Sequence, residues 1–213
     1  MNSFVRKTPN ASGIISTLYS HALAQSGIDK PPYVRKWEED LGRELDNSDW
    51  NQIWNTTKTA SPNIQAVEAN YKVLTRWYLV PARIAKYAKN YSAQCFRGCS
   101  DIGIHFHTWW SCPKVQIFWI RIFKIASILS GKNIPLDPAT ALLNLKPEGI
   151  LHSQFKLLLQ LFTAAKQALA KAWRSSKLVV NEAVTKMNNT MTHPKMLAID
   201  TDMIPQFVKM WKP

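Results

Sequence analysis

The residues best suited to chemistry are three cysteines and a histidine gathered in one short segment. They follow the spacing Cys95-x3-Cys99-x7-His107-x4-Cys112, and the chain has no further cysteine. Thiolates and a neutral imidazole are ligands that suit Zn²⁺, and four of them fill its tetrahedral shell. Because all three cysteines fall within residues 95–112, the spacing predicts a bound zinc ion in a knuckle of the CCHC type.

A second histidine provides an alternative ligand. His105 would give the spacing Cys99-x5-His105-x6-Cys112, in which the second gap is longer, and we favour His107 for that reason. With four protein ligands the site has no open position for water, so the zinc would be structural rather than catalytic. A metal-free interpretation, in which buried thiols lie beside a core histidine, stays open.

Basic and aromatic residues surround these ligands, which predicts a nucleic-acid-binding surface. Guanidinium planes and aromatic rings can stack on unpaired bases, while lysines neutralise phosphates. Trp110 and Trp119 are expected in the core, because tryptophan is highly buried on average. We favour Arg97 and Lys114 as contacts. The full set of candidate nucleic-acid-binding residues is Arg76, Arg83, Lys86, Lys89, Arg97, Trp109 and Lys114.

The net charge points to the same class of partner. The 213 residues include 27 Lys+Arg and 14 Asp+Glu, a formal charge of +13, and the excess lies after residue 60. This asymmetry favours RNA or DNA as a partner, although basic residues can also merely solvate helix faces. No apolar run is long enough for a membrane span and no signal peptide is recognised, so we expect no membrane partner and a nuclear or cytoplasmic rather than secreted protein.

Apolar residues recur at three- and four-residue steps and strand alternation is absent, which predicts a mostly α fold. We expect a helical module with a small CCHC zinc knuckle inserted between helices. Helices are expected over 33–45, from an N-cap at Ser48, from 62 to about 79, and over 82–91, 113–130, 151–174 and 181–191, with a short one after Pro138.

The chain divides into three parts on this interpretation. Residues 1–32 form a connecting segment with a short helix at 14–24, residues 33–175 hold the helical region with the knuckle at 95–112, and residues 176–213 form a tail with one helix. The buried faces of three helices are expected at definite positions. These are Ile64, Val67, Tyr71, Leu74 and Tyr78; then Val115, Phe118, Trp119, Ile122, Ala126 and Leu129; and then Phe155, Leu158, Phe162, Ala165, Leu169 and Trp173.

No catalytic signature accompanies these features. A polymerase needs paired carboxylates to hold two Mg²⁺ ions, yet no Asp-Asp pair follows an aromatic residue. Asp200 and Asp202 lie in a proline-flanked tail and are expected to be solvated. Glycine-rich phosphate loops and Gly-x-Ser-x-Gly motifs are also missing. We therefore do not expect an enzyme.

Five stretches resemble one known family in order and spacing. They are KWEEDLG, NYKVLTRWYLVPARIAKY, CFRGCSDIGIHFHTWWSCPKVQIFW, IPLDPATALLNL and QFKLLLQLFTAAKQALAKAWRS. Together they resemble the C-terminal region of LINE-type non-LTR retrotransposon reverse transcriptases from about residue 33 to residue 174. Phe96 stands where that family usually has Trp, and Ile104 where it commonly has Thr, but neither is a ligand.

The resemblance implies a site and a role. Cys95, Cys99, His107 and Cys112 take the family's zinc positions, and the region would help to hold template RNA or target DNA beside a polymerase domain, here supplied in trans. The family's endonuclease domain and polymerase palm are not recognised in these residues, so neither activity is expected. The alternative is a translated retroelement relic in which the zinc only holds the fold together.

Overall fold

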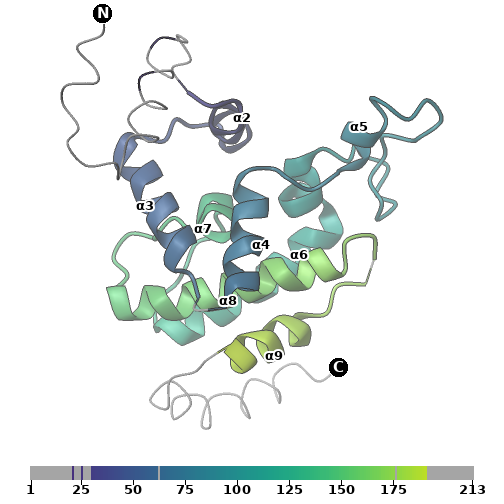
Figure 1. The fold of residues 1–213 in the computed structure, drawn as a ribbon. Helices are drawn as coiled ribbons and strands as arrows, with labels where there is room; N and C mark the ends of the chain where they lie inside the picture. The colour runs from purple at the N-terminus through teal and green to yellow at the C-terminus, as the bar shows by residue number, and fades with distance from the viewer. Residues whose placement is uncertain (1–20, 22–24, 26–29, 62, 176, 191–213) are drawn as a thin grey trace, which may run out of the picture.

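Helices α4 (Ile64–Leu74), α6 (Pro113–Ser130) and α8 (His152–Lys171) build the core, and α8 contacts both of the others as well as α9 (Val180–Thr190). The computed structural model describes residues 21, 25, 30–61, 63–175 and 177–190. Within these residues helices dominate and β-pairing is limited to an isolated bridge, so the expected mostly α class is confirmed (Figure 1).

Helix α6 begins and ends where its sequence predicts. Pro113 occupies the first turn, where its missing N–H costs nothing, and Gly131 ends the helix with a φ of +65° that favours glycine. The predicted apolar stripe faces the core. Trp119 and Phe123 of this helix pack on Phe162 of α8, with ring centroids 6.5 and 5.0 Å apart.

Helix α8 is also close to its predicted range, and α7 (Pro138–Leu143) precedes it. The side chain of Asp137 caps α7 by accepting a hydrogen bond from the backbone N–H of Thr140, at 2.7 Å. Lys166 of α8 is completely buried, and its ammonium group donates to the carbonyl oxygen of Leu142 and to Oδ1 of Asn144, at 3.3 and 2.5 Å. This lysine therefore joins α8 to the C-terminal end of α7.

Helices α2 (Pro32–Leu41) and α3 (Asn47–Thr59) lie on the N-terminal side of the core. The predicted N-cap of α3 at Ser48 is wrong. Asp46 caps the helix instead, because its carboxylate accepts from the Asp49 N–H while the Asp49 carboxylate accepts from the Asp46 N–H. Helix α2 is fixed to the end of α4, since the indole N–H of Trp37 donates to the carbonyl of Leu74 at 2.7 Å.

Helix α4 differs from its prediction in length and in orientation. It ends at Leu74 rather than near 79, and Arg76 then takes a φ of +57°. Ile64, which was expected in the core, is 76% exposed. The buried face instead includes Asn70, whose side-chain amide donates to the hydroxyl of Thr163 on α8 at 3.0 Å. The buried face of α4 is therefore offset from the predicted apolar stripe. The buried residues are Ala66, Ala69, Asn70, Val73 and Leu74.

The helix expected over 82–91 is reduced to a single turn, α5 (Pro81–Ile84), followed by turns and extended chain. The short helix expected at 14–24 and most of the expected tail lie outside the described residues. Among the residues that are described, no helix combines the length and the apolar character that a membrane span requires.

Candidate metal centre

The first two cysteines lie on a compact loop closed by backbone hydrogen bonds. The Cys95 N–H donates to the carbonyl of Asp101 at 2.8 Å, beside an isolated bridge between Gln94 and Ile102. The Gly98 N–H donates back to the carbonyl of Cys95 at 3.0 Å, and Gly98 has a φ of +66°. The loop thus turns Cys99 toward the sulfur of Cys95.

The histidine and the last cysteine are positioned by a π-helical turn, η1 (His107–Ser111). The N–H of Cys112 donates to the carbonyl of His107 at 2.9 Å, the five-residue step of such a turn. Cys112 is also the residue before α6, and its carbonyl accepts from Val115 and Gln116. Cys112 is therefore fixed directly at the N-terminal end of α6.

These elements bring the four predicted ligands together. The sulfur of Cys112 lies 3.9 Å from that of Cys95 and 3.8 Å from that of Cys99, and the Cys99 sulfur lies 3.1 Å from Nε2 of His107. All four donor atoms lie within 4.8 Å of one another. A tetrahedral ion with metal–sulfur bonds of about 2.3 Å needs sulfurs about 3.8 Å apart. The four side chains therefore fit a tetrahedral metal ion.

His105 does not belong to this group. Its ring is buried edge-on against Trp37, with centroids 5.5 Å apart, and neither ring nitrogen has a hydrogen-bond partner. Burial and, to a lesser extent, the nearby charge of Arg76 lower the pKa of His105 to about 3, so the ring is neutral. The choice of His107 over His105 agrees with where the structure places the two rings.

The environment of the thiols favours a bound cation. Burial raises the pKa of Cys95 to about 11, and the neighbouring Cys99 and Cys112 also raise it. Three adjacent thiolates repel one another, so they are stable together only when a positive charge lies between them. The three cysteines are free rather than paired in disulfides.

Arg97 supplies a further positive charge, and this corrects its prediction as a nucleic-acid contact. The side chain is only 2% exposed, and Nη1 donates to the carbonyl of Thr108 at 3.0 Å. Burial lowers the pKa of Arg97, whereas the sulfurs of Cys112, Cys95 and Cys99 raise it. Three thiolates around a divalent ion would leave one negative charge, which the buried guanidinium beside the sulfurs would balance.

Asp101 is an outer partner that sequence reasoning missed. Its Oδ2 lies 3.8 Å from Nδ1 of His107, on the side of the ring away from the sulfurs. At this distance it makes no hydrogen bond, but a carboxylate that moved within hydrogen-bonding distance would orient a metal-bound imidazole. The signal was present in the sequence, since Asp101 is the one acidic residue among nine basic ones in residues 71–124.

Three other predicted contacts are also engaged within the protein. Trp109 is fully buried, with its ring 5.3 Å from that of Trp173, so its prediction as a contact is wrong. Arg76 pairs with Asp40 and lies over the ring of Trp37 at 4.5 Å. The ammonium of half-buried Lys114 donates to the carbonyl of Arg97. Trp110 and Trp119 are buried, as predicted.

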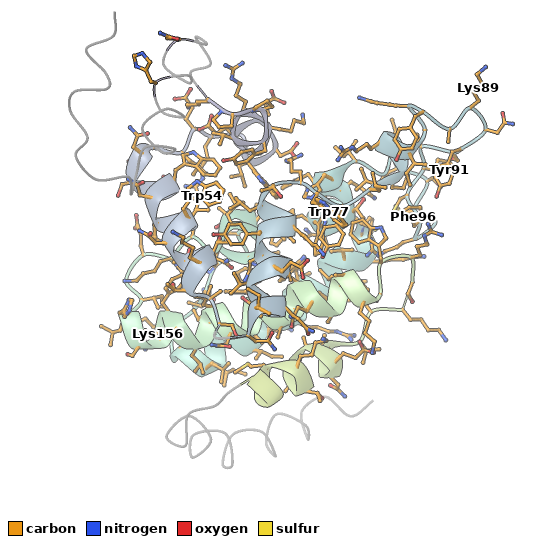
Figure 2. All side chains as sticks on the ribbon, viewed as in Figure 1. Trp54, Trp77, Lys89, Tyr91, Phe96 and Lys156 are labelled. Atoms are coloured by element: carbon orange, nitrogen blue, oxygen red, sulfur yellow. The ribbon has the colours of Figure 1, made fainter. Side chains whose placement is uncertain are left out.

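The remaining candidates lie together on the segment 81–93, which we call the basic segment. Arg83, Lys86 and Lys89 are all exposed there, and Figure 2 shows Lys89 at the far edge of the molecule. Gly103 holds both ends of the segment: its carbonyl accepts from Ala82 at 3.2 Å, and its N–H donates to the carbonyl of Ala93 at 2.8 Å. The basic segment is therefore attached directly to the loop that carries the metal ligands.

Gly103 itself is required by close packing. A Cβ atom at this position would lie 2.6 Å from Cγ of Pro81, the first residue of the basic segment.

No known family model matches the chain. The assignment of a function accordingly depends on the site itself.

Proposed function

We propose that this chain is a zinc-stabilised nucleic-acid-binding module, similar to the C-terminal region of LINE-type reverse transcriptases. The observation that carries the proposal is the attachment of the exposed basic segment to the metal centre through Gly103. A metal that fixes this loop also fixes three cations at the surface. The proposed partner is RNA or DNA.

Zinc is the proposed metal because of the donor set. Three sulfurs and one imidazole nitrogen within 4.8 Å of one another suit Zn²⁺ well, whereas calcium and magnesium prefer oxygen ligands. The ligands are mostly buried, and Cys95 and Cys112 belong to the same apolar cluster as the core tryptophans. Such an ion would hold the loop in shape, with no position left for a reacting water.

The basic segment has the composition of a phosphate-binding surface. It contains three basic residues and no acidic one, and Tyr87 and Tyr91 are exposed beside them. Phosphate contacts from Arg and Lys supply most of the sequence-independent affinity of nucleic-acid-binding proteins. The segment protrudes from the helical core in Figure 1, beyond α5, where a long polyanion can reach it.

A purely structural role is the second candidate. The burial of the ligands within the core favours it, because a metal in that position stabilises the fold whether or not anything binds the surface. The two candidates differ in what the exposed cations of the basic segment do.

The test is the salt dependence of nucleic-acid binding. The variant with Arg83, Lys86 and Lys89 all changed to Ala should bind a labelled RNA more weakly, and the slope of log K against log salt should flatten by roughly one unit per lost phosphate contact. The matched control removes the same charge elsewhere, at the exposed Arg35, Lys58 and Lys156. Figure 2 shows Lys156 far from the basic segment.

An equal effect of the two triple variants would mean that only net charge matters, and would leave the structural role as the better proposal. A dissociation constant for RNA weaker than about 1 μM at physiological salt would also favour the structural role, since non-specific binding by basic proteins has that strength.

A further inference from the structure

We propose that four aromatic side chains at the base of the basic segment form a stacking platform for the bases of single-stranded nucleic acid. This inference rests on the proposed function and names its substrate class. The platform consists of Trp77, Tyr78, Phe96 and Trp173. Two of these residues come just before the basic segment, one just after it, and one from the chain beyond α8.

The four rings touch in a row. Trp77 meets Tyr78 edge to face with centroids 5.8 Å apart, Tyr78 lies 5.0 Å from Trp173 at a tilt of 31°, and Trp173 lies 6.5 Å from Phe96. The row is attached to the core, because the buried Trp109 packs against both Tyr78 and Trp173 at 5.0 and 5.3 Å. The platform is therefore rigid at its centre.

One end of the platform is exposed to solvent, and the rest of it is partly exposed. Trp77 is 61% exposed, and the other three rings are half-buried. A tryptophan so exposed is unusual, since this residue is highly buried on average. Figure 2 shows Trp77 and Phe96 on the same side of the fold as Lys89 and Tyr91 of the basic segment.

A cation lies over each end ring. The ammonium of Lys72 lies 4.6 Å from the centre of the Trp77 ring, and the guanidinium of Arg174 lies 5.3 Å from that of Phe96. Lys72 also pairs with Glu68 at 2.7 Å, which holds its side chain in place. Aromatic faces next to positive charges are complementary to a strand whose bases stack and whose phosphates are anionic.

This arrangement favours single strands over duplexes. In a duplex both faces of each base are covered by neighbouring base pairs, whereas unpaired bases can turn a face toward an aromatic side chain. The basic segment would bind the phosphates of both single strands and duplexes, whereas the platform can stack only on unpaired bases.

The test compares one labelled strand of about 16 nucleotides, the upper end of the site size of a small single-strand-binding domain, with the duplex of the same sequence. Trp77→Ala should weaken single-strand binding by about tenfold and leave duplex binding unchanged, whereas Trp77→Phe should retain most of the affinity. The matched control is Leu151→Ala, which removes an equally exposed apolar side chain at the opposite end of α8.

Either an unchanged affinity of Trp77→Ala for the single strand, or an equal loss for strand and duplex, would overturn the platform. The proposed function would survive that result as long as the triple variant of the basic segment still lost affinity for both probes. The exposure of Trp77 makes misfolding an unconvincing explanation for a selective loss, and an unchanged melting temperature would exclude it.

Discussion

At the scale of single residues, the structure separates side chains that the sequence presents as equivalent. His105 and His107 are two positions apart, yet one ring packs against Trp37 and the other lies 3.1 Å from the sulfur of Cys99. Arg97 and Arg83 are both basic residues near the knuckle, yet one is buried beside the thiols and the other is exposed. Type and spacing alone do not distinguish the members of these pairs.

The two histidines provide a matched test of the metal centre. We expect His107→Phe to lose the metal, because it removes a ligand, whereas His105→Phe should keep it and preserve an aromatic ring against Trp37. Native mass spectrometry of protein purified without added metal measures both. The expected result is one zinc in the parent and in His105→Phe, and none in His107→Phe. Retention of zinc by His107→Phe would contradict the ligand assignment.

Lys166 leads to a prediction about pH. Burial lowers its pKa well below the usual value, so between that lowered pKa and about 10.4 the unfolded chain binds more protons than the folded one. Its contribution to stability therefore rises with pH over this interval. We expect the free energy of unfolding of the parent, measured by urea denaturation, to increase relative to that of Lys166→Met between neutral pH and about pH 9.5.

The control for this measurement is the exposed Lys156 on the same helix. The free energy of unfolding of Lys156→Met should run parallel to that of the parent across the same pH interval, because the side chain of Lys156 is in contact with solvent in the folded protein. A Lys166→Met profile that also ran parallel to the parent would show that the buried ammonium keeps an ordinary pKa.

At the scale of elements, the sequence was informative where apolar periodicity and terminal signals agree. Helices α6 and α8 were predicted almost to their ends, since Pro113, Gly131 and long apolar stripes all point the same way. The prediction was wrong for the face of α4, whose buried side includes Asn70, hydrogen-bonded to Thr163 of α8, while Ile64 is exposed. Because Thr163 is 93 residues away from Asn70, the sequence around α4 does not indicate this hydrogen bond.

Residues 82–91 were predicted to form a helix that begins after Pro81. The structure retains a single helical turn there, since the chain must return to Gly103. The four side chains of the candidate metal centre, in contrast, lie together as their spacing predicts, because metal coordination restricts residue type and spacing more strongly than packing does. The burial of Arg97 and Trp109 depends on what surrounds them in space, and the sequence could not reveal it.

Gly103 provides the test at this scale. We expect Gly103→Ala to destabilise the protein by about 1–3 kcal/mol, because its Cβ would overlap the ring of Pro81. Hydrogen exchange should become faster at the Ala82 and Gly103 amides, which tie the basic segment down. Adding Pro81→Ala removes the two closest ring carbons and should recover part of the loss. If Pro81→Ala recovered none of the stability lost in Gly103→Ala, the overlap with the Pro81 ring would not be the cause of that loss.

At the scale of the whole molecule, the charge and the core occupy different parts of the fold. Helices α4, α6 and α8 supply most of the apolar burial, whereas the exposed cations that matter for the proposed function lie on a protruding segment. The candidate metal centre is connected to both: Cys112 directly precedes α6, and the loop of Cys95 is hydrogen-bonded close to Gly103. Under the proposed function, these four side chains would connect folding to binding.

The closure of the basic segment at Gly103 has a consequence for how such a protein can change. Both ends of the segment meet one residue, so its interior forms a closed loop, and doubling the length of a flexible loop costs only about 0.6 kcal/mol. Insertions, deletions and charge changes within 84–91 can therefore accumulate while the ligands and the core stay the same. Under the proposed function, the nucleic-acid preference of such a chain could change within this loop without a new fold.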